Sequence, residues 1–252
     1  MKDRIILQVK DIKKSYPGLP TLEDISLDLG KGEFVSILGP SGCGKSTLFN
    51  IISGLERPDR GTIIIDGRDY NGKTGRVSYM HQKDLLLPWR NILDNVCLPL
   101  FINNVKRPDA HKKAREYFPD FGLKGFEEKY PHQLSGGMKQ RAALLRTYLF
   151  ADDIMLLDEP FGSLDAITRR KMQDWLLGLF EKIDASILFI THSIDEAIFL
   201  SDRIYLLSQR PGRVTKIFDI GLSRPRDLDV LTSTKFNQLK QEIIRLLVQE
   251  EE

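Results

Sequence analysis

The sequence predicts an α/β fold with a mainly parallel sheet and a helical segment inserted in its middle. Strand-length apolar runs at 33–38, 154–157 and 186–190 are followed by helical patterns, and this alternation is typical of a parallel sheet with helices on both faces. Between about Lys83 and Phe150 the pattern is mostly helical. The chain has 252 residues, 41% of them hydrophobic, which suffices for one large domain with a sizeable core.

Each element is predicted from periodicity, apolar runs and turn residues, in chain order. Alternating apolar and polar residues predict a half-buried strand over 22–29. The strand 33–38 ends at Gly39, and a helix over 45–55 closes at Ser53-Gly54. The remaining predictions are strands at 62–66, 76–80, 154–157, 186–190, 203–207 and 214–219, helices at 166–182, 194–200 and about 235–248, and loops of the helical segment at 87–89, 106–109 and 130–136.

Composition excludes several classes of protein. The 37 basic and 35 acidic residues leave a net charge of +2, too small for a basic surface that binds nucleic acid without specificity. Two cysteines, Cys43 and Cys97, cannot form a disulfide framework and indicate a reducing compartment. No apolar run approaches the ~18 residues of a membrane span. We therefore expect any contact with a membrane to go through a partner.

A phosphate-binding loop is predicted at residues 39–46. The segment GPSGCGKS fits the pattern G-x-x-x-x-G-K-[ST] and lies between a predicted strand and a predicted helix. Backbone N–H groups would converge there on phosphate oxygens, together with the positive end of the helix. Lys45 would bridge the β- and γ-phosphates, and Ser46 would place its hydroxyl on Mg²⁺. The alternative, an ordinary glycine-rich turn, is disfavoured by the flanking elements.

Two carboxylates end the apolar strand predicted at 154–157. In a protein with a phosphate loop, Asp158 would hold Mg²⁺ through its waters and Glu159 would orient the water that attacks the phosphate. Taken alone, the pair is more simply explained as a solvated strand end. The phosphate loop upstream favours the functional interpretation.

A second anion site is indicated where the helical run that ends at Phe150 begins. The segment 134–141 (LSGGMKQR) places Ser135, Gly136 and Gly137 at a helix N-terminus. By itself such a segment is an N-cap and a loop. Because one phosphate loop binds one triphosphate, a second site for a γ-phosphate predicts that it serves a neighbouring molecule.

In this order and over nearly the whole chain, the motifs resemble the nucleotide-binding domain of ATP-binding cassette transporters. The resemblance implies a single ATPase domain over 1–252 that takes ATP and Mg²⁺. It implies a P-loop NTPase (RecA-like) core with an antiparallel β subdomain over about 1–82 and 151–252. It also implies an inserted α-helical subdomain over about 83–150, which carries the signature motif.

The resemblance also implies a role for each matching residue. Nucleotide would be bound by Tyr16, stacked on adenine, and by Gly39, Pro40, Ser41, Gly42, Cys43, Gly44, Lys45, Ser46 and Thr47. ATP of a partner subunit would be bound by Ser135, Gly136 and Gly137, and Asp165 ends the D-loop. The implied catalytic residues are Lys45, Gln82, Glu159 and His192, and the implied Mg²⁺ residues are Ser46, Gln82 and Asp158.

Three positions leave alternatives or depart from the family pattern. Tyr16 is otherwise an ordinary loop aromatic, and His192 a strand-end histidine. Met138 stands where many members have Gln. This departure leaves the signature's role intact, because that role depends mainly on Ser135 and the backbone of the two glycines.

A subgroup is indicated by the segment 82–89 (QKDLLLPW), by 90–96 and by 224–226. These are similar to importers of nitrate, sulfonates, taurine and thiamine-pyrimidine precursors. The resemblance implies a homodimer that is peripheral on the cytoplasmic face of the inner membrane. Its partner would be a membrane permease, which receives solute from a solute-binding protein, and no nucleic-acid partner is expected. Leu85, Leu86, Leu87, Trp89 and a helix over 91–101 would form the groove for a permease helix, unless the leucines merely fill a core.

Two other classes of protein are weighed against this one. A soluble cassette ATPase acting on nucleic acid or ribosomes would carry tandem cassettes, a coiled-coil arm or a strongly basic face. A small P-loop kinase or GTPase would share the phosphate loop but has no use for 134–137 or His192.

Overall fold

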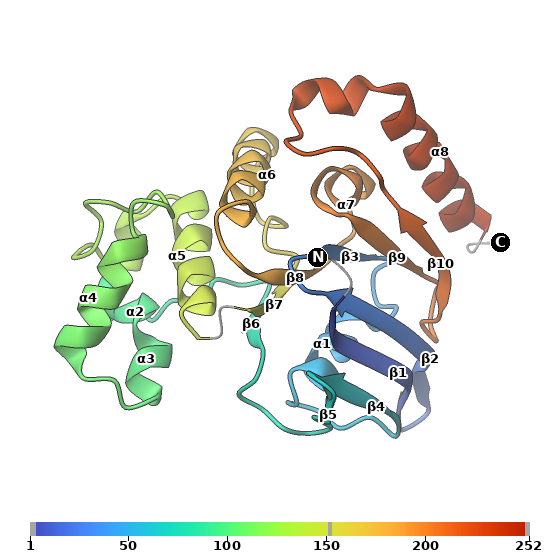
Figure 1. Ribbon diagram of the computed structural model, residues 1–252, viewed down its shortest axis with the longest axis horizontal. Helices are drawn as coiled ribbons and strands as arrows, with labels where there is room; N and C mark the ends of the chain where they lie inside the picture. The colour runs from blue at the N-terminus through green and yellow to red at the C-terminus, as the bar shows by residue number, and fades with distance from the viewer. Residues whose placement is uncertain (1–3, 151–152, 250–252) are drawn as a thin grey trace. The chain divides into compact units, whose positions relative to one another are not determined.

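The computed structural model describes residues 4–150 and 153–249, which group into two compact units (Figure 1). The first unit comprises the chain up to Val77 and again from Ala185, and the second runs from Ser78 to Asp184. The predicted helical segment at 83–150 lies wholly within the second unit, and its bounds as a subdomain stay a prediction. No helix in the described ranges is both long and apolar enough to cross a membrane.

An antiparallel sheet forms one layer of the first unit. Its strands are β1 (Ile5–Tyr16), β2 (Leu19–Gly30), β4 (Arg60–Ile65) and β5 (Arg68–Asp69), in the order β2-β1-β4-β5. The strand predicted at 22–29 is confirmed within a longer β2, whereas β1 and β5 were not predicted. The register of β1 with β2 shifts between Val9 and Ile12, and Asp11 has φ 51°. This irregularity interrupts the alternation by which the strand would have been recognised.

Parallel strands form the other layer of the first unit. β3 (Phe34–Leu38) pairs in parallel with β8 (Ser186–Thr191) on one side and with β9 (Arg203–Leu207) on the other. β10 (Val214–Asp219) adds antiparallel to β9. β3 and β8 are buried along their whole length, which explains their continuous apolar runs. The helices of this unit are α1 (Lys45–Ile52), α7 (Ile194–Leu200) and α8 (Thr234–Gln249), with a 3₁₀ turn η2 (Leu228–Thr232).

The second unit combines a short parallel strand pair with helices. β6 (Ser78–Met80) pairs with the wholly buried β7 (Ile154–Asp158). The helices are α2 (Ile92–Val96), α3 (Leu98–Ile102), α4 (Arg107–Tyr117), α5 (Gly136–Tyr148) and α6 (Ala166–Phe180), with a 3₁₀ turn η1 (Pro131–Gln133). The mostly helical pattern is confirmed, but the loop predicted at 106–109 is wrong from Arg107 onward. Pro108 lies in the first turn of α4, where a missing N–H breaks no helical bond.

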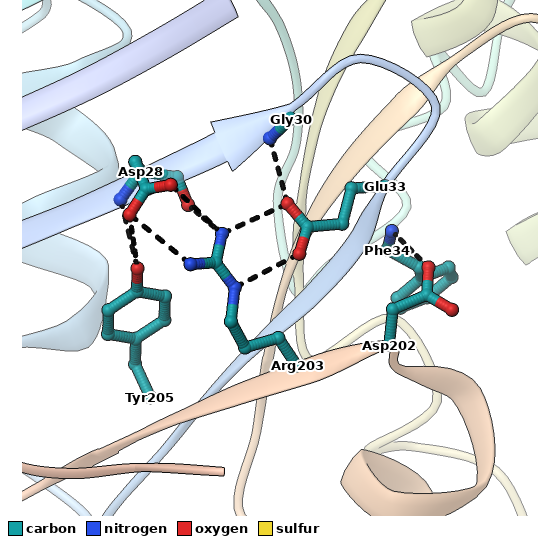
Figure 2. A network of polar contacts seen from close by, with 7 residues as sticks. All are labelled: Asp28, Gly30, Glu33, Phe34, Asp202, Arg203 and Tyr205. Atoms are coloured by element: carbon teal, nitrogen blue, oxygen red, sulfur yellow. Dashed lines mark hydrogen bonds and ion pairs between the residues drawn. The ribbon is translucent and has the colours of Figure 1, made fainter. Parts of the chain in front are cut away.

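An ion-pair network ties the two layers of the first unit together (Figure 2). Arg203 of β9 donates from Nε to Glu33 Oε1 at 3.0 Å and from Nη2 to Asp28 Oδ2 at 3.1 Å, and the Tyr205 hydroxyl donates to Asp28 Oδ1 at 2.7 Å. Although partial burial opposes it, the Arg203 guanidinium and the Tyr205 hydroxyl hold the pKa of Asp28 below its usual value. Strand β2 is thereby fixed to β9 of the sheet that carries the phosphate loop.

Candidate functional site

The phosphate loop lies in the first unit between β3 and α1, as predicted. Gly44 is the N-cap of α1 and has φ 106°, and Gly42 has φ 78°. A Cβ atom at Gly44 would lie 2.6 Å from Leu22 Cδ2 and 3.0 Å from the Thr21 carbonyl oxygen. Only glycine satisfies both the backbone angle and the close approach of β2. The motif spacing is therefore a steric requirement of this turn.

Lys45 points into its own loop. Its Nζ donates to the Gly39 and Pro40 carbonyl oxygens at 2.8 Å each, and the side chain is only 6% exposed. Carbonyl oxygens are neutral acceptors, and a phosphate oxygen is a stronger partner for the same ammonium group. Cys43 Sγ lies 3.8 Å from Nζ, and burial raises the pKa of this thiol. The loop thus holds a buried cation that a phosphate group can attract.

An arginine that was not predicted contacts the same loop. Arg210 donates from Nε and Nη2 to the Gly42 carbonyl oxygen at 2.9 and 2.5 Å. Its segment is fixed to β2, because the Gly212 amide donates to the Thr21 carbonyl oxygen at 2.9 Å. The bond to Gly42 joins residues 168 positions apart, and no local pattern of the sequence indicates it.

Tyr16 is the last residue of β1 and is 39% exposed, so it does not lie in an ordinary loop. Its hydroxyl donates to Glu56 Oε2 at 2.8 Å, and Thr47 of α1 lies close to the same hydroxyl. Partial burial and the Glu56 carboxylate raise the pKa of Tyr16. The ring is thereby placed beside α1, and its stacking on adenine stays a prediction.

His192 follows β8 directly and is exposed. β8 runs parallel to β3 with Thr191 opposite Leu38, so His192 and Gly39 leave neighbouring strands at the same level. In open α/β sheets ligands bind at the carboxyl ends of such strands. The first unit therefore brings His192 to the same sheet edge as the phosphate loop.

The second unit brings the two acids and the predicted glutamine together. Asp158 ends β7, is 6% exposed and accepts a hydrogen bond from the Tyr79 hydroxyl at 3.2 Å. Burial and the charge of Asp158 raise the pKa of Tyr79, so this hydroxyl stays a donor. Gln82 Nε2 donates to Glu159 Oε2 at 3.2 Å. An amide and a carboxylate predicted to act on one water are thus in direct contact.

Glycines allow α5 to begin close to α6. Ser135 is the N-cap of α5, and its Oγ accepts from the Met138 amide at 3.4 Å. Ser135 and Gly136 are exposed. A Cβ atom at Gly137 would lie 3.2 Å from Thr168 Cγ2 of α6, a contact tighter than side chains ordinarily make. The signature segment thus presents an exposed hydroxyl at Ser135 and exposed backbone at Gly136, whereas Gly137 is buried.

Asp165 caps α6 from the D-loop. Its Oδ1 accepts from the Thr168 and Ile167 amides at 3.0 and 3.1 Å, and these bonds lower its pKa. Asp165 was predicted only as a D-loop residue, and the structure adds its role as the N-cap of α6. An Asp immediately before a predicted helical run is a signal that predicts such a cap.

The predicted docking residues differ in burial. Trp89 is 71% exposed and Leu85 is 53% exposed, whereas Leu86 is buried at 8%. Leu86 therefore fills the core, as the alternative interpretation held. Asn95 fixes the loop from both sides, accepting from the Leu87 amide at 2.7 Å and donating to the Leu87 carbonyl oxygen at 3.1 Å.

Comparison with known proteins adds independent findings. The sequence profile of the family described as ABC transporter matches residues 22–162. The aliphatic sulfonates import ATP-binding protein SsuB of Bacillus thuringiensis is 40% identical over 94% of this chain and 92% of its own. The formylaminopyrimidine import ATP-binding protein ThiZ of Halalkalibacterium halodurans is 42% identical over 97% of each chain. The ATP-binding cassette MJ0796, solved as a dimer in a post-hydrolysis state with ADP and Pi, is 30% identical and superposes with a TM-score of 0.72 over 86% of this chain and 100% of its own.

Proposed function

We propose, because this chain belongs to the ABC transporter family, that it hydrolyses ATP to drive the uptake of a small organic or anionic solute. The chain is an importer ATPase subunit of the kind that its named relatives represent. The contact between Gln82 and Glu159 carries the catalytic part of the proposal, because it joins the two groups expected to act on the attacking water. Sulfonates, taurine, nitrate and pyrimidine precursors are the solute class proposed.

ATP would be held first by the phosphate loop. The backbone of Gly39 to Thr47 would surround the phosphates, and the buried Lys45 ammonium would exchange its two carbonyl partners for β- and γ-phosphate oxygens. Tyr16 would stack on adenine. The positive end of α1 adds to the attraction.

The proposed Mg²⁺ donors are all oxygen atoms, from the Ser46 hydroxyl, the Gln82 amide and the Asp158 carboxylate. This donor set fits a hard cation that prefers oxygen ligands and keeps several waters. Bound Mg²⁺ would neutralise negative charge that develops on the phosphates. Asp158 would act through the waters of the ion, held in place by β7.

In hydrolysis, Glu159 would orient the attacking water and accept its proton. Gln82 would pass from Glu159 to the water and the ion, and His192 would contact the γ-phosphate. Because His192 and the phosphate loop share one sheet edge, this contact requires no rearrangement of β3 and β8.

Two copies of the chain would bind ATP between them. Ser135, Gly136 and Gly137 would meet the γ-phosphate held by the partner's loop, with Asp165 near the junction. The exposed α5 N-terminus supports this arrangement, since an anion there is stabilised by unsatisfied backbone N–H groups. The dimeric state of the related cassette is further support.

A membrane permease is the proposed partner, with a solute-binding protein acting through it. The chain would then lie peripherally on the cytoplasmic face of the inner membrane and bind no nucleic acid. The net charge of +2 fits this better than a role on DNA or ribosomes. Co-purification with membrane protein rather than with nucleic acid would distinguish an importer ATPase from a cassette ATPase that acts on DNA or ribosomes. A screen of phosphate acceptors would distinguish it from a small P-loop kinase.

The test compares ATP hydrolysis and association in the wild type, Lys45→Ala and Glu159→Gln. Lys45→Ala loses a charge-assisted contact worth ~1.5–3 kcal/mol in binding, and hydrolysis should become undetectable. Glu159→Gln should bind ATP, hydrolyse it very slowly and elute as a dimer in gel filtration with ATP and Mg²⁺. Wild-type rates in Lys45→Ala, or a monomeric Glu159→Gln protein with ATP bound, would contradict the proposal.

A further inference from the structure

One short segment of the second unit contacts both acids at the end of β7. The Tyr79 hydroxyl donates to Asp158 Oδ2, and three residues later the Gln82 amide donates to Glu159 Oε2, each at 3.2 Å. We infer that Tyr79 is a positioning residue, which orients the Asp158 carboxylate for Mg²⁺. The inference rests on the proposed function, because it requires that Asp158 act on Mg²⁺ bound with ATP.

The Tyr79 side chain is held by regular structure. Tyr79 lies in β6 with Leu156 of β7 opposite, and the neighbouring Ser78 Oγ donates to the Ile154 carbonyl oxygen at 3.1 Å. The imidazole of His81 packs on the phenol ring, with 4.0 Å between ring centroids and 35° between planes. Because β6 is paired along its length with the strand that ends in Asp158, regular backbone pairing sets the position of the hydroxyl relative to the carboxylate.

The bond restricts the carboxylate without blocking it. An ionised carboxylate offers about four lone-pair sites, so one hydroxyl donor is compatible with an ion and its waters on the same group. Mg²⁺ demands near-ideal octahedral geometry, which makes its affinity sensitive to the orientation of a carboxylate. Asp158 is only 6% exposed, so water has little access to take the place of the hydroxyl.

Removing the hydroxyl alone separates positioning from packing. Tyr79→Phe keeps the ring and its contact with His81 but leaves Asp158 without this donor. Asp158 would reach the ion through its waters, and mutation of such outer-shell contacts typically lowers metal affinity or activity by about 10- to 100-fold. We therefore expect a change in metal dependence with little change in the binding of metal-free nucleotide.

The experiment uses Mn²⁺ as a paramagnetic probe for the Mg²⁺ position. Wild type, Tyr79→Phe and the control Tyr117→Phe, which removes a hydroxyl from α4 of the same unit, are loaded with a non-hydrolysable ATP analogue. Free Mn²⁺ is then measured by electron paramagnetic resonance. The Mn²⁺ concentration at half-saturation should rise about 10-fold in Tyr79→Phe alone. Affinity for the analogue in EDTA, and kcat at saturating Mg²⁺, should stay close to wild type.

Each other result counts against the inference in a recognisable way. If Tyr79→Phe binds Mn²⁺ like wild type, or is isolated only unfolded, the hydroxyl does not position Asp158 for metal and the inference is overturned. A wild-type protein that binds the analogue and Mn²⁺ independently of each other would instead contradict the proposed function itself. A tenfold loss of analogue affinity in EDTA would assign Tyr79 to folding of the site, and would also overturn the inference.

Discussion

At the scale of single residues, the phosphate loop depends on a side chain from far along the chain. Arg210 holds the carbonyl oxygen of Gly42 through two hydrogen bonds. The Cys43 amide of the same peptide plane donates to the Pro40 carbonyl oxygen at 3.4 Å. Because carbonyl and amide of one peptide plane point in opposite directions, Arg210 fixes which way the Cys43 N–H faces and thereby holds the turn from Pro40 to Cys43. Such preorganisation lowers the free-energy cost of binding.

We therefore expect Arg210→Gln to bind ATP with lower affinity than the wild type. We expect the loss of loop order to cost between about 0.7 and about 1.4 kcal/mol of binding free energy. This cost corresponds to a rise of about 3- to 10-fold in the Kd for ATP. The change should be measured by fluorescent-nucleotide titration. Arg213→Gln is the matched control, because Arg213 lies in the same loop but is exposed and pairs with Glu23 at 2.5 Å instead of with the phosphate loop. Equal affinities in the two variants would show that Arg210 does not order the loop.

At the scale of elements, helix α5 is bound to the segment that follows Gln82. Arg146, near the end of α5, donates from Nη1 to the Leu85 carbonyl oxygen at 2.7 Å and from Nη2 to the Asp84 carbonyl oxygen at 2.5 Å. The guanidinium is partly desolvated, and this burial lowers the pKa of Arg146. The last turns of α5, whose N-cap is Ser135, therefore hold the loop that follows Gln82, the residue proposed to act on the attacking water.

Removal of this link should destabilise the second unit. A charged hydrogen bond in a desolvated position is worth ~1.5–3 kcal/mol, so Arg146→Leu should lower the free energy of unfolding by about 2 kcal/mol. Urea unfolding followed by tryptophan fluorescence measures this, because both tryptophans, Trp89 and Trp175, lie in the second unit. Arg115→Leu, which breaks an exposed pair with Glu128, should cost under ~1 kcal/mol. Similar losses in both variants would rule out a special role for Arg146.

The elements that the sequence predicts well are those with local signals. The phosphate loop is recognisable because the backbone angles and the close approach of β2 require glycines at a fixed spacing. Strands β3, β7 and β8 are recognisable because complete burial makes most of their residues apolar. Tyr79 and Arg210 escaped prediction because they act across 79 and 168 residues. Only strand pairing and loop packing bring such groups together, and neither leaves a local pattern.

At the scale of the whole molecule, the distribution of exposed apolar side chains bears on assembly with a permease. Trp89 is 71% exposed and lies on a loop that is held at two points. The wholly buried Asn95 hydrogen-bonds Leu87, and Arg146 hydrogen-bonds the backbone of Leu85. An exposed aromatic on a rigid loop loses little conformational entropy when a partner covers it. Tryptophan is also enriched among the residues that dominate binding energy at interfaces.

Trp89→Ala should therefore weaken assembly with the permease and leave the isolated subunit intact. Truncation of an aromatic anchor typically costs ~2 kcal/mol or more, about 30-fold in affinity, so membrane association and solute uptake should fall together. Basal ATP hydrolysis and the urea midpoint should stay at wild-type values, because an exposed side chain contributes little to the fold. Leu55→Ala, which trims a side chain 61% exposed in the first unit, controls for loss of apolar surface in general. The measurement is co-purification with the permease and uptake into vesicles. Normal assembly of Trp89→Ala would show that the permease does not dock on Trp89, and unfolding of the variant would show that this side chain stabilises the fold instead.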